Sequence, residues 1–317
     1  FGSLFHTEGD PWVSRGRFAE LFGLNHDADF QARWGRISHE IVYARDPRTG
    51  QVLGGAIYAA MIPPADVRDE AQVDALCYAS YIFTHPDARS SGLALRLIRE
   101  RERAVLRVAD AALGDSVARQ RTLLSVNEQN DPLKMTCQKA LEDFRTTGLW
   151  AWDRLASSYL KAGWQWLAGG FEYVDPGSPG DEGSKYLRLN VKSETGKGPL
   201  ATVPTSLVRY FLQMCAVLRR PDRAPEQDRT FRNQCHQLLG IDVFRPVNDG
   251  ERMNQLKPSF LRLAKRATKP NTPVPMHTPI GVMLDREARR RAEQRVANQN
   301  QPSGRPVRHA TSYGLTR

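Results

Sequence analysis

Over the first 62 residues, the apolar positions change from helical spacing to strand-like runs. The apolar residues within 18–22 recur at helical spacing, which predicts a short helix. Ile41–Arg45 and Val52–Ile62 are β-rich, and residues 46–50 between them read Asp-Pro-Arg-Thr-Gly. Pro and Gly in so short a connection are typical of a turn. We therefore predict a β-hairpin after a short helix.

Residues 75–126 predict a strand, a helix and a second strand. Ala75–Phe83 is short, apolar and almost uncharged, as expected of a buried strand. Pro86 ends it, because proline cannot donate a hydrogen bond to a strand ladder. Leu93–Ala112 has apolar residues on one helical face with arginines and glutamates between them, which predicts an amphipathic helix. Thr122–Val126 has the composition of another buried strand.

The remaining strands are short and separated by irregular segments. Residues 130–150 predict an inserted, partly helical segment, and Trp152–Ala162 predicts a helix. Trp164–Leu167 has the composition of a strand. Residues 175–185 are rich in Gly and Pro, which is typical of a loop. Tyr186–Val191 alternates polar and apolar residues and is the last strand that we expect.

The chain changes character near Ser193–Pro204, which is rich in Gly, Thr and Pro. Beyond this segment we expect no strands, because the apolar residues recur at helical spacing. Residues 269–317 are Pro-rich and basic. We therefore predict three parts: an α/β domain over residues 1–195, a helical extension over 196–268 and a tail over 269–317.

Positive charge is concentrated in the C-terminal third. The net charge is +10, and residues 201–317 hold 21 Lys and Arg against 9 Asp and Glu. Residues 1–200 hold 24 against 26. Such a distribution favours an acidic partner for residues 200–317, either a protein or a nucleic acid contacted through its phosphates.

The four cysteines form no C-x-x-C pair, and their spacing suits no common zinc site. We therefore expect reduced thiols, no metal and an intracellular, reducing compartment, either the cytoplasm or a larger particle. No run of 18 apolar residues occurs, so we expect no membrane partner.

The segment that carries chemistry connects the strand at 75–83 to the helix at 93–112. It contains six residues: Arg89, Ser90, Ser91, Gly92, Leu93 and Ala94. Their small side chains let main-chain N–H groups approach a ligand closely. These N–H groups lie at a helix N-terminus, where the helix dipole favours an anion. An arginine beside them adds a charge-assisted contact, so the segment predicts a phosphate-binding loop.

This segment resembles the GNAT N-acetyltransferase superfamily, whose pyrophosphate loop reads Gln/Arg-x-x-Gly-x-Gly/Ala after a strand. Residues 89–94 match that pattern. The stretch Tyr159-Leu160-Lys161-Ala162-Gly163-Trp164 resembles the family's Tyr-x-x-x-Gly-Phe helix end, with Trp replacing Phe. The resemblance covers roughly residues 12–191. It implies an α/β fold with a mixed, mostly antiparallel twisted sheet flanked by helices, here followed by a mainly helical basic extension.

The resemblance also implies an acyltransferase that uses acetyl-CoA as co-substrate and an amine of a protein or small molecule as acceptor. It places the pyrophosphate on residues 89–94. It places the pantetheine arm beside the end of one strand, at Ile82, Phe83 and Thr84. Asn127 is implied to lie near the thioester, and Tyr159 to protonate the departing thiolate.

The general base stays open at this point. Some members of the family carry a Glu on the central strand, but Ala75–Phe83 has no carboxylate. Glu128 is the first candidate, because it follows Asn127 at a predicted strand end. The alternatives are Glu40 and deprotonation through water. Tyr159 has the alternative role of a core residue, and Asn127 that of a loop cap.

Two functions are therefore compared. The first is an acyltransferase. The second is a non-catalytic scaffold that keeps the fold and is anchored by its basic C-terminal extension in a large assembly, such as a ribonucleoprotein or virus particle. Binding of acetyl-CoA separates the two.

Overall fold

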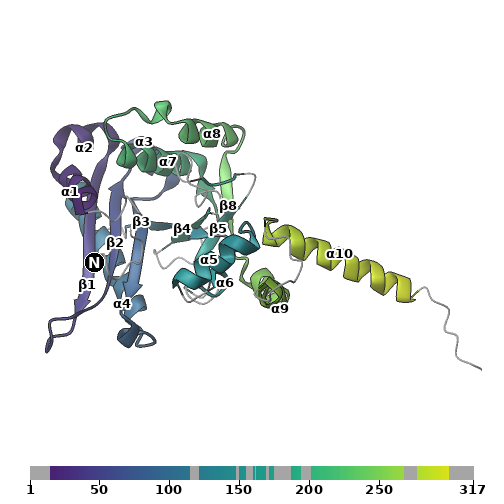
Figure 1. Ribbon diagram of the computed structural model, residues 1–317. Coiled ribbons are helices and arrows are strands. Elements are labelled where there is room, and N and C mark those ends of the chain that lie inside the picture. The colour runs from purple at the N-terminus through teal and green to yellow at the C-terminus, as the bar shows by residue number, and fades with distance from the viewer. Residues whose placement is uncertain are drawn as a thin grey trace, which may run out of the picture.

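The computed structural model describes residues 15–114, 121–147, 150–154, 160, 162–168, 171–174, 187–193, 201–267 and 277–299. Within these residues, one eight-stranded sheet forms the centre of the molecule (Figure 1). Its strands are β1 (Arg36–Arg45), β2 (Val52–Ile62), β3 (Ala75–Thr84), β4 (Leu123–Asn130), β5 (Gln165–Ala168), β6 (Leu187–Ser193), β7 (Val203–Pro204) and β8 (Val243–Val247). Their order is β1-β2-β3-β4-β6-β5-β8-β7.

Helices lie on both faces of this sheet (Figure 1). They are α1 (Arg15–Gly23), α2 (Ala28–Trp34), α3 (Ala65–Ala71), α4 (Leu93–Leu113), α5 (Cys137–Thr147), α6 (Ala151–Arg154), α7 (Thr205–Arg219), α8 (Arg229–Gln237), α9 (Gly250–Ala267) and α10 (Ile280–Gln299). Short 3₁₀ turns are η3 (Leu24–His26), η4 (Pro86–Ala88) and η7 (Pro225–Gln227). The strand pairs are antiparallel apart from β3–β4. The predicted fold class is confirmed.

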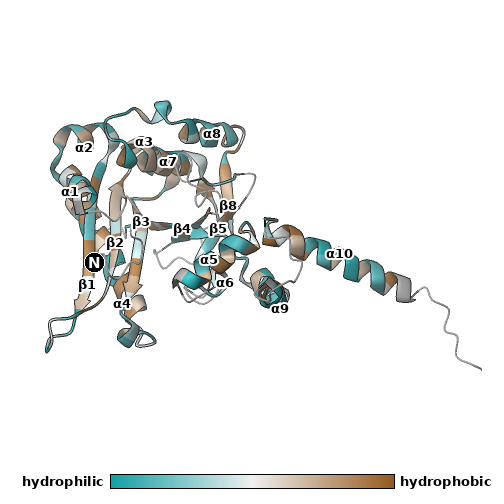
Figure 2. Ribbon diagram, viewed as in Figure 1, coloured by the Kyte–Doolittle hydropathy of each residue, from teal (hydrophilic) through white to brown (hydrophobic). Residues whose placement is uncertain are grey.

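Strand β2 reads as a continuous apolar run because both of its faces are covered. Ala59 and Met61 belong to the core on the α7 side, whereas Tyr58 and Ala60 belong to the core under α4. Figure 2 shows hydrophobic residues along the central strands and along α7. The alternation along β2 thus defines an α7 face and an α4 face of the sheet.

Strand β4 is longer than its apolar composition predicts. Its polar end pairs with β6 through to Asn130, which lies opposite Leu187. Asn127 and Glu128 therefore lie inside the strand, and the prediction that they follow its end is wrong. Long-range pairing with β6 extends the ladder into residues with no local strand signal.

The prediction that strands stop before residue 204 is also wrong. Strand β8 pairs with β5, placing Val247 opposite Trp166, and β7 pairs with β8. Helix α7 covers one face of this sheet. Its Phe211 and Leu212 share one core with Leu76 of β3 and Val126 of β4. The core therefore joins residues on both sides of position 195.

A second core joins the insertion after β4 to the end of the chain. The rings of Trp152 in α6 and Phe260 in α9 stack with centroids 4.9 Å apart. Ile280 and Leu284, at the start of α10, are buried in the same cluster. Beyond them α10 leaves the body of the molecule, and Figure 2 shows mostly hydrophilic residues along it.

A buried ion pair fastens the start of α9 to β6. Arg188 is 1% exposed, and its guanidinium donates two hydrogen bonds to the carboxylate of Asp249, at 2.8 and 2.9 Å. Its Nε donates to Asn190 at 2.9 Å, and the guanidinium lies 5.1 Å from the centre of the Trp166 ring. The guanidinium is thus paired on every side.

We expect Asp249→Ala to lower the free energy of unfolding by about 3–5 kcal/mol, because it leaves the buried Arg188 without its counter-charge. Denaturant titration measures this change. Asp222→Ala is the control, because Asp222 makes exposed ion pairs, for which about 0–1 kcal/mol is expected. A loss below about 1 kcal/mol for Asp249→Ala contradicts the prediction.

Candidate functional site

The connection between β3 and α4 is shaped by its own hydrogen bonds. The ring Nε2 of His85 lies 3.1 Å from the Nε2 of Gln51 in the β1–β2 connection. The hydroxyl of Ser91 donates to the carbonyl of Ala88 at 2.7 Å. On either side of it, Ser90 (φ 63°) and Gly92 (φ 76°) have left-handed backbones. Such turns direct successive N–H groups into a concavity that suits an anion.

Helix α4 begins at this connection with its N–H groups open. No side chain of the described residues caps it, and its first helical hydrogen bond runs from the N–H of Arg96 to the carbonyl of Gly92. The N–H groups of residues 93–95 therefore have no helical acceptor. A Cβ atom built at Gly92 would meet no atom within 4 Å outside the two adjacent residues. The space before the helix is open, as anion binding requires.

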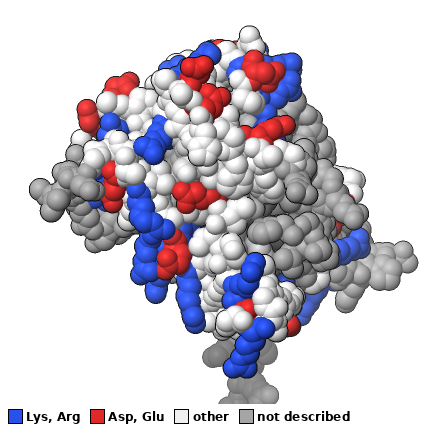
Figure 3. All heavy atoms as spheres, turned by 90° about the vertical axis from the view of Figure 1, so that its left-hand side faces the viewer, with Lys and Arg blue, Asp and Glu red and all other residues white. Residues whose placement is uncertain are grey.

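Exposed arginines lie on the segments that border this opening. They come from the β1–β2 connection, the loop and the first turns of α4: Arg45, Arg48, Arg89, Arg96 and Arg99. Figure 3 shows Lys and Arg side chains gathered in the lower half of the molecular face that it views, at the height of the hairpin tip in Figure 1. This positive charge favours a polyanionic ligand.

Next to the loop, β3 and β4 separate. They form a parallel pair only from Ala75–Leu123 to Tyr78–Val126. Residues 79–84 of β3 continue beside β2, and residues 127–130 of β4 continue beside β6. Ser80 is an extra residue in the β2–β3 ladder, which shifts register there. We call the gap between 79–84 and 127–130 the split.

Asn127 and Glu128 lie at the start of the split and point to opposite faces of the sheet, since side chains alternate along a strand. Asn127 is on the α4 face. It is 2% exposed, and its Oδ1 lies 3.4 Å from Nδ2 of Asn190 on β6. The structure thus ties Asn127 to a polar network inside the sheet.

Glu128 is on the α7 face among polar groups from three other segments. Its carboxylate accepts a hydrogen bond from the hydroxyl of Tyr173. Burial raises the pKa of Glu128, while the hydrogen bond from Tyr173 and the charge of Arg219 on α7 partly oppose that shift. Burial also lowers the pKa of Arg219 and raises the pKa of Tyr78. A carboxylate with a raised pKa is a stronger proton acceptor.

The structure brings several predicted site residues together. Residues 82–84 line one edge of the split, the loop at 89–94 lies at its open end, and Asn127 and Glu128 lie at its closed end. Tyr159 lies outside the described residues. Glu40 accepts a hydrogen bond from Tyr58 at 2.7 Å and lies on β1, three strands or roughly 14 Å from β4. That position removes Glu40 from the candidate bases.

Sequence reasoning missed the groups around Glu128. The sequence presents Tyr78 only as part of a buried strand, and Tyr173 and Arg219 come from segments that carry no recognisable motif. Glu128 and Tyr173 are 45 positions apart. No local signal indicates their contact, because Glu128 lies on β4 and Tyr173 follows β5, and only the pairing of both strands with β6 brings these segments close together.

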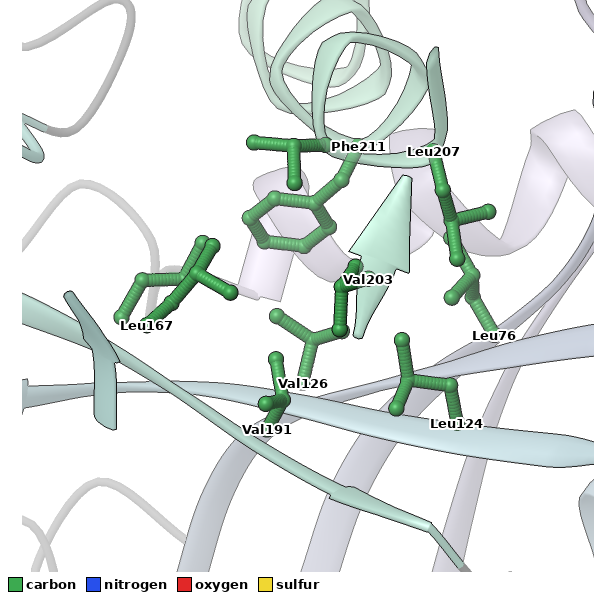
Figure 4. Close-up of a pocket in the computed structure, with 10 residues that line it drawn as sticks. Leu76, Leu124, Val126, Leu167, Val191, Val203, Leu207 and Phe211 are labelled. Atoms are coloured by element: carbon green, nitrogen blue, oxygen red, sulfur yellow. The ribbon is translucent and has the colours of Figure 1, made fainter. Parts of the chain in front are cut away.

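A separate cavity lies between α7 and the sheet, and it is not a ligand site. Its volume is about 10 Å³, close to the least space that holds one water. Figure 4 shows its lining, which is wholly apolar and includes Val126, Leu167 and Phe211. We interpret it as a small packing defect of the core.

The described residues contain no cluster of three or more His, Cys, Asp and Glu suited to a metal ion. Among the helices of the described part of the chain, none combines the length and apolar character needed to cross a bilayer.

Comparisons with known proteins find only distant likeness. No family model matches the sequence, and no curated protein matches it. An acetyltransferase from Bacillus cereus is similar over 57% of this chain and 93% of its own, with 10% identity and a TM-score of 0.26. An aminoglycoside 6′-N-acetyltransferase complexed with coenzyme A is similar over 56% and 89%, with 14% identity and a TM-score of 0.29. Similarity at this level says nothing about the chemistry of the site.

The raised pKa of Glu128 has a consequence for stability. The folded chain holds the carboxyl proton of Glu128 more tightly than the unfolded chain does. As pH rises above about 4.5, the unfolded chain releases this proton first, so wild type loses stability relative to Glu128→Gln. Urea titrations of both proteins from about pH 4 to about pH 8 measure this difference. Glu172→Gln, at an exposed neighbour of Tyr173, is the control and should show no such trend. A constant difference between wild type and Glu128→Gln contradicts the shift.

Proposed function

We propose that this protein transfers an acetyl group from acetyl-CoA to an amine. One observation carries the proposal: the uncapped N-terminus of α4, with open space at Gly92, faces out beside the split between β3 and β4. An anion site at the open end of a gap between strands suits a ligand with a charged head and a long, neutral arm. CoA has that form.

In the proposed complex, the pyrophosphate binds the N–H groups of the loop at 89–94, with Arg89 as a charged partner. The pantetheine arm then follows the edge of β3 beside Ile82, Phe83 and Thr84. Residues 79–84 span about 17 Å, which offers an extended arm a long edge to follow. The thioester would thus come to lie near Asn127 and Glu128.

Glu128 is the proposed general base. It removes a proton from the ammonium group of the acceptor, and the amine nitrogen then attacks the thioester carbonyl carbon. The carbon–sulfur bond breaks as the new carbon–nitrogen bond is completed. The CoA thiolate takes up a proton, for which Tyr159 is the proposed donor, and the second proton that the acceptor nitrogen loses as the amide forms restores the Tyr159 hydroxyl. The acceptor approaches from the α7 face, opposite to the face of the sheet on which α4 begins.

Gly92→Asp tests the anion site. We expect loss of acetyl-CoA binding by calorimetry, because a carboxylate then stands where the phosphates bind. Gly114→Asp is the matched control: Gly114 also has a left-handed backbone (φ 77°) and open space, but follows the other end of α4. A carboxylate is less favourable at that end, so the control loses at least as much stability. Equal binding by both variants contradicts the proposed loop contact.

Glu128→Gln tests the proposed base. We expect turnover to fall by about 10²-fold or more, with unchanged affinity for acetyl-CoA, because the amide cannot accept the proton. Release of CoA thiol with a panel of primary amines and small basic proteins measures the rate. Glu172→Gln should keep wild-type turnover. Equal rates for wild type and Glu128→Gln would assign deprotonation to water.

The second candidate is a scaffold anchored by the C-terminal extension. It is favoured by α10, whose described side chains from Asp285 onward lie largely in solvent, away from the body of the molecule (Figure 1). A lone helix of this kind gains little from packing, so a partner surface would stabilise it. A folded wild-type chain that fails to bind acetyl-CoA would favour this second function.

A further inference from the structure

The α4 face of the sheet buries a positive charge, and two of its three nitrogens lack partners among the described residues. Arg101, on α4, is 3% exposed. Its Nε and Nη2 are buried, and neither has a hydrogen-bond partner. Within the described part of the chain, no carboxylate forms an ion pair with this guanidinium. Arg188, the other deeply buried arginine on this face, is by contrast fully paired.

Such a group is unfavourable in an empty protein, because two of its nitrogens lose their water on burial and gain no partner from the described residues. A protein that keeps such a group stores strain, hydrates it with a buried water or supplies its donors to a bound ligand. The last explanation requires that a ligand reach the position of Arg101.

The position of Arg101 along α4 can be derived from its neighbours. At the start of α4, Leu93 lies 3.1 Å from a Cβ built at Gly54, which pairs with Thr84. Further along, Val105 shares a core with Cys77. Arg101 lies between these anchors, about 12 Å from the start of the helix. It is therefore level with the first residues of β3 beyond Tyr78, where β3 and β4 begin to separate.

A second buried polar atom without a partner lies on β4, near the level of Arg101. Ser125 is fully buried, and its Oγ has no hydrogen-bond partner among the described residues. It lies opposite Cys77, in the last residue pair but one before the split. Side chains alternate along β4, so Ser125 faces α4 together with Leu123 and Asn127. Unmatched donors from α4 and from β4 thus lie on the same face of the sheet, near the level at which β3 and β4 begin to separate.

We propose that Arg101 binds a carbonyl oxygen of the pantetheine–acyl arm of CoA, within the split. This inference rests on the proposed function and adds a binding residue to it. The pyrophosphate is not the partner, because it binds about 12 Å away at the start of α4. Amide and thioester carbonyls of the arm are the acceptors that reach this level, and Ser125 can supply a further donor.

Calorimetry on the full chain tests the assignment with three ligands: acetyl-CoA, CoA, and 3′-phosphoadenosine 5′-diphosphate, which is CoA without its pantetheine arm. We expect Arg101→Met to weaken acetyl-CoA binding by about 10- to 100-fold and to leave binding of the armless nucleotide unchanged. Arg101→Lys, which keeps the charge, should recover part of the loss. Arg103→Met is the control, because Arg103 is exposed and contacts Glu100 on the surface.

Thermal unfolding without ligand separates binding from a structural role. Arg101→Met should melt at the same or a higher temperature than wild type, because it removes an unpaired buried charge. A lower melting temperature with unchanged acetyl-CoA affinity would overturn the assignment and make Arg101 structural. Equal weakening for the armless nucleotide would overturn it too. If wild type binds none of the three ligands, the proposed function fails, and this inference with it.

Discussion

The short parallel ladder between β3 and β4 is the constraint on which the rest of the site depends. Four residue pairs hold the two strands together, and then each strand follows its other neighbour. A sheet seldom leaves two adjacent strands unpaired inside a domain, because buried main-chain groups need partners. The split therefore supplies main-chain donors and acceptors for an extended ligand.

The two faces of the split differ in charge. The α4 face carries hydrogen-bond donors: the loop N–H groups, the exposed arginines near the start of α4 and the buried guanidinium of Arg101. These donors suit the oxygen atoms of phosphates and carbonyl groups. On the α7 face lies Glu128, whose pKa burial raises and whose carboxylate is held by Tyr173. This separation suits a transfer in which an anionic donor and a cationic acceptor approach the same thioester from opposite sides.

The C-terminal third completes the domain instead of merely following it. Helix α7 covers the apolar face of β3, β4 and β6, and β8 extends the sheet beyond β5. The Arg188–Asp249 pair then fastens α9 to the same sheet. Among the described elements, α10 alone stands apart from this body, which makes it the element best placed to contact another molecule.

The local sequence pattern determined several elements of this fold. Turn chemistry at residues 46–50 predicted the hairpin, apolar runs predicted β2 and β3, helical spacing predicted α4, and small residues before it predicted an open helix N-terminus. Each of these depends on neighbours in sequence. Tertiary structure alone decided that β4 continues through Asn127 and Glu128, that β8 joins the sheet, and that Tyr173 meets Glu128. Those outcomes depend on contacts between distant segments, and the free energy of such contacts comes from surfaces that exist only once the sheet has formed.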